Sequence, residues 1–311
     1  MKISYSRFSS YLHCPYQHYL RYVEHLTGIQ PVRPLHFGSD FHKLLEVRTD
    51  KKQIKKEWRK IKEEFYEMPG SWQTELGENY PEDLRVIFSD YMNQWKDTPL
   101  PNRTEFSFSL PVADNIEFIG VIDELYIYDK DKIDIGEHKT FSTPPNMNTL
   151  IMNTQKSLYC KAAEMIWGKL PQKVRWDYIK STPAKYPIWL EKSGRFSTAT
   201  SKDITPRSWR RACKERGITD PSILEQGKQY KGNENNFFFR VEQDVYSEMV
   251  ENVFDGFVYT CKDIVKQGTT NKTKNLTRDC AWCGFRDICM AELSGGDREY
   301  VISEKFLRKE G

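Results

Sequence analysis

Long apolar runs are absent from this sequence of 311 residues. The longest unbroken ones, Leu125–Tyr128 and Ile288–Ala291, have four residues each. A helix that crosses a bilayer needs about 20 apolar residues. The first residues, Met1–Tyr5, also lack the apolar core of a secretory signal. We therefore expect a cytoplasmic protein with neither a membrane span nor a membrane partner.

Cysteine is scarce and odd in number, with seven residues in a chain that shows no export signal. This argues against a disulfide framework and makes metal ligation the first hypothesis for the thiols. An excess of charge is missing too, because 47 Lys and Arg residues stand against 44 Asp and Glu residues, a net charge of +3. Charge alone therefore does not indicate a nucleic-acid partner. Aromatic residues, at 14%, supply enough apolar area for a packed core and exclude disorder.

The basic residues are concentrated in three segments, Lys51–Tyr66, Ser201–Gly217 and Lys262–Arg278. Segments of this kind can follow the phosphate backbone of a nucleic acid. They can equally be solvated helix faces, which is the commoner situation for any one segment taken alone.

The hydrophobic pattern predicts a mixed α/β core, because helical and strand-like periodicities alternate along the chain. The expected elements are a short helix capped by Ser6 and ended by Pro15, helices over 38–47 and 51–67, a β-meander over 105–141 with a polar turn at Asp129–Lys132, a helix over 150–167, a strand over 173–179 and a helix over 246–265. We expect one domain over 1–311. Its parts are a helical region (1–100), core strands and a helix (101–180), a polar insertion lobe (181–240) and a C-terminal helix with a cysteine cluster (241–311).

Two carboxylates and a lysine lie within the predicted meander, at Asp123, Glu137 and Lys139. Carboxylates on neighbouring strands can hold Mg²⁺ or Mn²⁺, and a lysine two residues beyond the second one points to the same side of its strand. This arrangement suits metal-assisted hydrolysis of phosphodiesters. Acidic and basic residues at alternate positions are also common on solvated strands. Here, however, they directly follow Ile133 and Ile135 on one side of the strand, which indicates a strand that leaves the core and enters a polar cleft.

Three further residues could reach the same cleft. Gln155 and Tyr159 are four apart on the helix after the meander, although such a pair is usually an ordinary surface pair. His42 is a candidate ligand for a divalent metal, although a lone histidine beside an apolar stripe is more often structural.

The cysteines near the end of the chain form the pattern C-x₂-C-x₅-C at Cys280, Cys283 and Cys289. Three thiolates within ten residues can ligate one metal centre, and a centre of four thiolates needs one more. Cys14, beside Pro15, is the best candidate for the fourth. Zinc sites usually present two CxxC pairs, so this spacing favours an iron–sulfur cluster, with zinc as the alternative. A metal held in this way would join the two ends of the chain.

Taken together, these motifs resemble the RecB/AddB-type PD-(D/E)XK nucleases with an iron–sulfur cluster, which include the CRISPR-associated Cas-four exonucleases and phage-encoded relatives. The resemblance spans nearly the whole chain. It rests on motifs that occur in the expected order: Ser6 with Cys14-Pro15, Gly38…His42…Glu46, Gly120-Val-Ile-Asp123, Glu137-His-Lys139, Gln155-x₃-Tyr159, and Cys280, Cys283 and Cys289. The length and the polar lobe are most similar to the phage members.

The resemblance implies a restriction-endonuclease-like PD-(D/E)XK core, a mixed sheet flanked by helices, with an insertion and an iron–sulfur clip between the terminal regions. It also implies a role for each matching residue. The metal ligands would be His42, Asp123, Glu137 and the backbone carbonyl of His138; Lys139 would act on the attacking water or the transition state; Gln155 and Tyr159 would position DNA or Lys139; and Cys14, Cys280, Cys283 and Cys289 would bind a 4Fe–4S cluster.

We therefore expect a single-strand DNA exonuclease, dependent on Mg²⁺ or Mn²⁺, that works on DNA with free ends. Its context would be phage DNA recombination, repair or replication, in the host cytoplasm if the protein is phage-encoded.

One departure from the family pattern is His138, because an apolar or aromatic residue is more usual at this position. Its imidazole could alter the metal preference or simply face the other side of the strand. The rival hypotheses are a non-catalytic iron–sulfur module that binds DNA or assists assembly, and a zinc-stabilised enzyme of unrelated chemistry.

Overall fold

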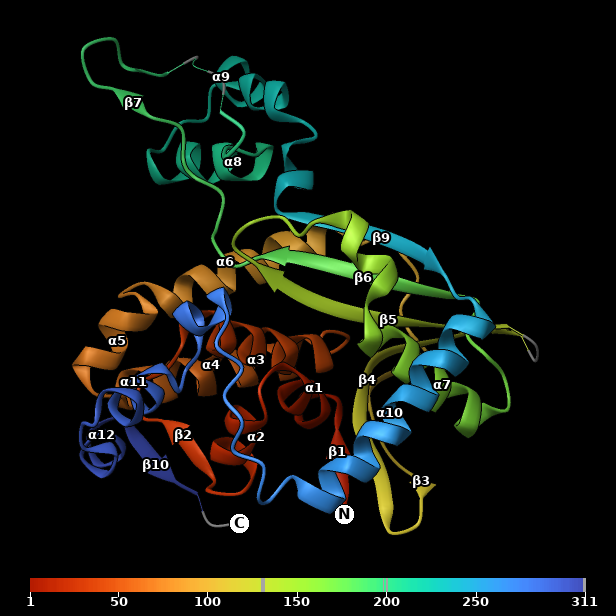
Figure 1. Ribbon diagram of the computed structural model, residues 1–311. Helices are drawn as coiled ribbons and strands as arrows, with labels where there is room; N and C mark the ends of the chain where they lie inside the picture. Colours follow the sequence, from red (N-terminus) through yellow and green to blue (C-terminus); the bar gives the residue numbers. More distant parts are fainter. Residues whose placement is uncertain (130–131, 198, 200, 310–311) are drawn as a thin grey trace.

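The computed structural model describes residues 1–129, 132–197, 199 and 201–309 (Figure 1). The strands are β1 (Lys2–Ser4), β2 (Leu26–Gly28), β3 (Arg103–Ala113), β4 (Ile116–Asp129), β5 (Lys132–Phe141), β6 (Lys173–Lys180), β7 (Trp189–Leu190), β8 (Arg195–Phe196), β9 (Phe238–Asp244) and β10 (Phe306–Arg308). The α-helices are α1 (Tyr5–His13), α2 (Pro15–Tyr22), α3 (Arg33–Glu46), α4 (Lys51–Glu67), α5 (Gly70–Leu76), α6 (Tyr80–Gln94), α7 (Thr154–Trp167), α8 (Pro206–Glu215), α9 (Pro221–Gln226), α10 (Ser247–Gln267), α11 (Arg286–Ser294) and α12 (Arg298–Lys305). The 3₁₀ helices are η1 (Met147–Met152), η2 (Gly227–Tyr230), η3 (Asn233–Asn236) and η4 (Arg278–Trp282).

The main sheet is mixed, as the sequence predicts, and its strands follow the order β1-β4-β5-β6-β9 with β3 paired to β4. Antiparallel pairing joins β3 to β4, β4 to β5 and β6 to β9. Parallel pairing joins β1 to β4 and β5 to β6. The predicted meander is therefore β3, β4 and β5. Two residues of its predicted turn, Asp129–Lys132, lie outside the described part of the chain.

The sheet divides beside the middle of β4. Strand β1 pairs with β4 at residues 117–119, whereas the pairing of β5 with β4 runs through residues 124–129. Among the described strands, only β3 pairs with residues 120–122 of β4. Beyond Gly136, β5 continues beside β6 and no longer pairs with β4. We call this division the fork, and it leaves room for side chains from both strands.

Helices cover both faces of the sheet (Figure 1). Helices α1, α7 and α10 share an apolar cluster with the strands that includes Phe118, Leu158 and Phe257. Helices α3, α4, α5 and α6 form a second cluster around Phe41 and Phe88, and this cluster also includes Ile179 of β6. The charged positions at the fork therefore lie between two packed layers.

Two smaller apolar clusters lie outside the sheet. In the insertion lobe, Trp209 and Tyr230 pack with Phe196. The first and last parts of the chain share the other cluster, in which Tyr16 and Leu20 contact Phe285 and Phe306. Strands β2 and β10 also pair there, so the two ends of the chain lie side by side (Figure 1).

Several predicted boundaries needed correction. Ser4, not Ser6, caps α1, because its hydroxyl accepts the backbone N–H of Arg7. Helix α3 begins at Arg33 rather than Gly38, since Pro34 fits the first turn of a helix. The helix predicted over 150–167 is α7, which begins at Thr154 after Asn153 caps it, while η1 occupies the residues before. The helix predicted over 51–67 is confirmed as α4.

No helix within the described residues is both long enough and apolar enough to cross a membrane.

Candidate active site

The fork brings the predicted carboxylates and lysine together. Asp123 lies on β4 where the strand lacks its β1 and β5 neighbours, and its Oδ2 accepts the backbone N–H of His138 at 2.8 Å. This hydrogen bond joins β4 to β5 just beyond their last paired residues. Asp123 and Glu137 are both buried, with 8% and 7% of their surface exposed. Two carboxylates in such a place need a counter-charge.

Lys139 provides part of that counter-charge. Its Nζ donates to Oε1 of Glu137 at 2.7 Å and to Oε1 of Gln155 at 3.0 Å. The side-chain amide of Gln155 donates to the same Glu137 oxygen at 2.7 Å. The three side chains thus form a closed triangle between β5 and the first turn of α7. Lys139 also lines an open groove of about 420 Å³ along the ends of β5 and β6.

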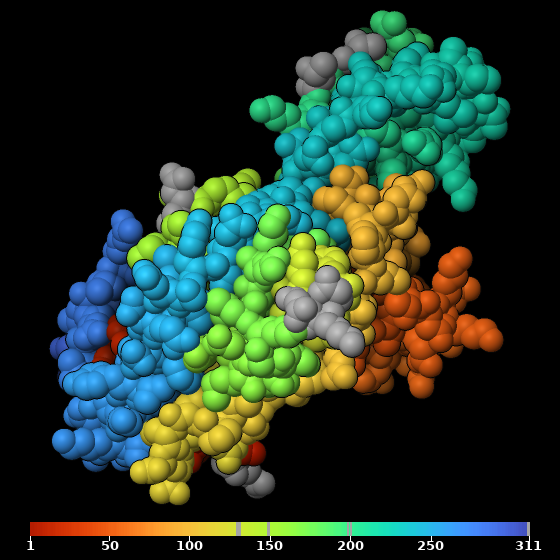
Figure 2. Space-filling view, turned by 90° about the vertical axis from the view of Figure 1, so that its right-hand side faces the viewer, coloured from red at the N-terminus to blue at the C-terminus, as the bar shows by residue number. Residues whose placement is uncertain are grey.

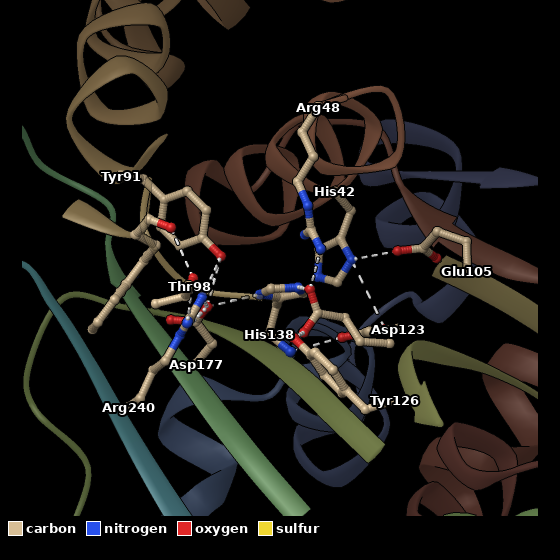
Figure 3. A network of polar contacts seen from close by, with 12 residues as sticks. His42, Arg48, Tyr91, Thr98, Glu105, Asp123, Tyr126, His138, Asp177 and Arg240 are labelled. Atoms are coloured by element: carbon tan, nitrogen blue, oxygen red, sulfur yellow. Dashed lines mark hydrogen bonds and ion pairs between the residues drawn. The ribbon is translucent and has the colours of Figure 1, made fainter. Parts of the chain in front are cut away.

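A second group forms on the other side of Asp123. Nδ1 of His42, from α3, lies 3.1 Å from Oε1 of Glu105 and 3.9 Å from Oδ1 of Asp123 (Figure 3). Each of these residues offers one ligand atom, and the three atoms lie within 4.8 Å of one another; they are the one such group among the described residues. Glu137 is outside this group, and Lys139 and Gln155 both bind its Oε1.

Glu105 is the residue that sequence reasoning missed. The register of β3 against β4 pairs Thr104 with Glu124 and Phe106 with Ile122, so Glu105 lies opposite Asp123. The alternation that places Phe106 and Phe108 on one face of β3 puts Glu105 on the other. Aligning the two predicted strands of the meander would have revealed it.

These donors fit a divalent ion. An octahedral ion with ligands at about 2.1 Å separates neighbouring ligand atoms by about 3.0 Å and opposite ones by about 4.2 Å. The two distances from Nδ1 of His42, 3.1 and 3.9 Å, lie in this range. Carboxylate oxygens with one imidazole suit Mn²⁺ and Mg²⁺. The residues present can therefore hold the metal for which the sequence motifs are typical.

The electrostatics of the site agree with this fit. Burial and the neighbouring charge of Glu137 raise the pKa of Asp123 to about 7. Burial alone would lower the pKa of His42, but the hydrogen bond with Glu105 and the charge of Asp123 raise it. Likewise, burial opposes the charge on Lys139, but Glu137 raises the pKa of its ammonium group. A divalent cation bound here would favour the charged form of Asp123.

The imidazole of His138 lies next to that of His42, with the ring centroids 5.8 Å apart, and it belongs to a buried polar network (Figure 3). Its Nε2 lies 3.0 Å from Oε1 of Glu124 and its Nδ1 lies 3.6 Å from Oδ2 of Asp177. Burial alone would lower the pKa of His138, but Glu124 and Asp177 raise it to about 9, so its imidazole is charged at neutral pH. Of the two expectations for this residue, the structure matches the one in which the imidazole faces the other side of the strand.

The network around His138 holds β5 in place. Arg48 donates to Glu124 at 2.6 Å, and Tyr91 of α6 donates to Asp177 at 2.6 Å. Arg240 of β9 also binds Asp177, at 3.0 Å. The backbone N–H of His138 donates to Asp123, so a network that fixes His138 also fixes the position of the Asp123 carboxylate.

Tyr159 lies beneath the site and is buried against Phe108 and Phe118. Burial and the charge of Glu137 raise the pKa of its hydroxyl above the ordinary range. A Cβ at Gly120 would lie only 2.6 Å from Phe108 and 3.3 Å from the Tyr159 hydroxyl, so this position of β4 requires glycine. Tyr159 therefore supports the strand that carries Asp123.

The four predicted cysteine ligands lie around one pocket of about 70 Å³, although they come from both ends of the chain. The pocket also includes Gln17, whose amide lies 3.8 Å from Sγ of Cys283. Within the described chain, no three cysteine sulfurs lie within 4.8 Å of one another. The three remaining cysteines, Cys160, Cys213 and Cys261, are buried elsewhere.

The family model for the PD-(D/E)XK nuclease superfamily matches residues 2–290. We found no curated protein that matches the chain.

Proposed function

The chain belongs to the PD-(D/E)XK nuclease superfamily, and on that premise we propose that it hydrolyses phosphodiester bonds of DNA with the help of a divalent metal. The observation that carries the proposal is the meeting of Asp123, Glu137 and Lys139 at the fork, with His42 beside them. Nothing structural requires two buried carboxylates, an imidazole and an ammonium group at one break in a sheet.

His42, Asp123 and Glu137 would hold the ion, together with the carbonyl of His138. Glu105 would be a further ligand, since it is closer to His42 than Asp123 is. When bound, Mg²⁺ or Mn²⁺ lowers the pKa of a water ligand and neutralises charge that develops on the phosphate oxygens.

Lys139 supplies the charge that the protein itself contributes. Its ammonium group can hold the attacking water or donate to a phosphate oxygen as negative charge builds up there. Gln155 holds both Lys139 and Glu137, so it fixes the direction of the ammonium group before DNA binds. We assign Tyr159 a positioning role, because its contacts support β4 and place it below the site.

The resemblance of the motifs to RecB/AddB-type and Cas-four nucleases extends the proposal. We propose a single-strand exonuclease that needs a free DNA end and acts in phage DNA recombination, repair or replication. The groove beside Lys139 supports a nucleic-acid substrate, because a strand lying in it would pass the ammonium group.

The test is a time course on 5′- and 3′-labelled linear DNA and on circular DNA, with Mg²⁺ or Mn²⁺. We expect the wild type to degrade linear single strands and Lys139→Ala to be slower by about 10²–10³-fold, as when a positioned charge is lost from a transition state. The control is Lys132→Ala at the opposite end of the same strand, which should keep full activity. Equal rates for wild type and Lys139→Ala, or no cleavage by either with both metals, would remove the nuclease proposal and favour a non-catalytic DNA-binding module.

We also propose that Cys14, Cys280, Cys283 and Cys289 hold a 4Fe–4S cluster. Support comes from their common pocket, which brings the four thiols together from both ends of the chain. The alternative is a single zinc ion, which four thiolates could also hold.

Spectroscopy separates these alternatives. Protein purified without oxygen should be brown, and Cys283→Ser should lose the visible absorption band, whereas Cys213→Ser should keep it. Four irons per chain by metal analysis are expected. One zinc per chain and a colourless protein would contradict the cluster without affecting the nuclease proposal.

A further inference from the structure

The insertion lobe and α6 enclose a groove that the site described above does not use. Its volume is about 410 Å³, within the range of ligand pockets, about 300–1,000 Å³. We call it the basic groove. The lining residues on which the argument depends are Arg85 and Asn93 of α6 and Arg207, Arg210, Arg211 and Lys214 of α8.

The spacing of the α8 cations places them on one helix face. Arg207, Arg210, Arg211 and Lys214 are related by steps of three and four residues, while Trp209 and Cys213 of the same helix are buried in the lobe. From Arg207 to Lys214 the helix rises about 10 Å. Phosphates of one strand of B-DNA are about 3.4 Å apart along the helix axis, so the row corresponds to about three of them.

Part of this charge has a structural explanation. Asp90 of α6 is buried and accepts two hydrogen bonds from Arg211, at 2.6 and 2.7 Å. Arg207 pairs with the same carboxylate at 2.8 Å. These ion pairs attach the lobe to α6, and Glu82 pairs with Arg85 at the rim of the groove.

Arg210 and Lys214 have no such explanation. Both are exposed, and neither forms an ion pair with any carboxylate of the described chain. Five cations line the groove and two carboxylates contact them, so a net charge of +3 remains. Anions of a partner would be the natural counter-charge.

The composition of the lining identifies the kind of anion. Among the residues that the structure describes, no aromatic side chain lines the groove, so these residues offer bases no ring to stack on. Arginine and lysine together with the amide of Asn93 offer donors suited to phosphate oxygens. The groove is also open and lies where the projecting lobe (Figure 2) meets α6, so a long polymer could pass through it.

Helix α6 separates the basic groove from the catalytic strands. One face of α6 lines the groove, while Tyr91 on another face donates to Asp177 behind the catalytic strand. We propose that the basic groove is a second DNA-binding surface, which holds the phosphate backbone without regard to base sequence. That the polymer is DNA rests on the proposed function. The charge and the shape of the groove do not depend on that function.

The test measures binding without cleavage. Fluorescence anisotropy with a labelled 30-nucleotide single strand and the matching duplex, in EDTA and at several KCl concentrations, gives affinity and salt dependence. We expect Arg210→Gln/Lys214→Gln to weaken binding of both probes about tenfold. The slope of log affinity against log salt should fall by about 0.7–0.9 for each lost contact. The matched control is Lys192→Gln/Lys231→Gln, which removes the same charge from exposed lobe positions outside the groove.

The outcomes separate this proposal from the nuclease proposal. Three results would overturn the proposal that the basic groove binds DNA: unchanged binding in the groove variant, an equal loss of binding in the control variant, or no DNA binding by the wild type. Weaker binding in the groove variant alone would support it, even if the wild type cleaves nothing. Conversely, cleavage that depends on Lys139 would stand if the groove variant bound normally.

Discussion

Glu105 has a backbone conformation that few glutamates adopt, with φ of +47° within β3. A non-glycine residue in this region costs about 1–3 kcal/mol, and such strain concentrates at functional sites. The result is a carboxylate directed at His42, 3.1 Å away. The structure thus tolerates a local cost where the carboxylate of Glu105 lies beside His42 and Asp123.

We expect Glu105→Gln to raise the Mn²⁺ concentration needed for half-maximal binding by about tenfold or more, the usual effect of losing a group that holds a metal ligand. Calorimetric titration with Mn²⁺ alone measures this without cleavage. Glu117→Gln, an exposed carboxylate elsewhere on β4, is the control. If both variants bound Mn²⁺ like the wild type, Glu105 would be no ligand.

The site could be predicted from sequence only as far as local rules reach. Side chains alternate along a strand, so Glu137 and Lys139 were placed on one side of β5 from the pattern alone. Glu105 depends on how β3 aligns with β4, which is a long-range pairing. The partners of His138 come from α6, β6 and other distant elements, and no local pattern reports them.

Strand β4 illustrates how an element supports the site. A side chain at Gly120 would clash, because Phe108 from β3 and Tyr159 from α7 pack against the backbone there. At Gly136 of β5 a Cβ would lie 2.6 Å from the carboxylate of Glu124, so β5 has the same restriction beside the network. Both strands of the fork are therefore tightly packed at a glycine next to their functional residues.

We expect Gly120→Ala to lower the free energy of unfolding by about 1–3 kcal/mol, because the added methyl group would lie against the ring of Phe108. Gly256→Ala should have the opposite sign. Gly256 is exposed within α10 with open space around its Cβ position, so alanine should stabilise the helix by about 0.5–1 kcal/mol. Urea unfolding of both variants gives the two values. Equal effects would show that the packing at Gly120 is not tight.

Helix limits were harder to predict than helix existence. The periodic apolar stripe of α4 gave its bounds correctly, since Asp50 caps its start. The predicted start of α3 was wrong because the apolar stripe was followed only from Gly38, whereas the helix begins at Arg33 with Pro34 in its first turn. The start of the helix predicted over 150–167 was wrong for a similar reason. Its apolar spacing continues through residues 150–153, but Asn153 caps α7, so η1 ends and α7 begins there.

Across the whole molecule, the first helices pack against the end of α10. His18 of α2 is fully buried at this contact, beside Gly268, and its Nε2 accepts from Arg7 at 3.2 Å. Burial and the charge of Arg7 lower the pKa of His18 to about 4. The folded protein therefore requires the neutral imidazole, whereas the unfolded chain binds a proton near pH 6.5.

This arrangement predicts a pH-dependent stability. Between about pH 6.5 and pH 4 the unfolded state binds the proton and the folded state does not, so folding loses stability as pH falls. His18→Gln keeps an acceptor for Arg7 but cannot titrate. We expect the Tm of the wild type to fall relative to that of His18→Gln as pH decreases from 7.5 to 4.5. A difference in Tm that stays constant over this range would contradict the assignment.

The insertion lobe leaves and rejoins the sheet at neighbouring strands. Lys180 at the end of β6 donates its backbone N–H to Phe237, and Ile179 pairs with Phe238 at the start of β9. Residues 185–236 therefore form an excursion whose two ends already meet as an antiparallel hairpin would. A protein engineer could exchange this excursion for a short turn, or for another module, and leave the strand order of the nuclease core as it is.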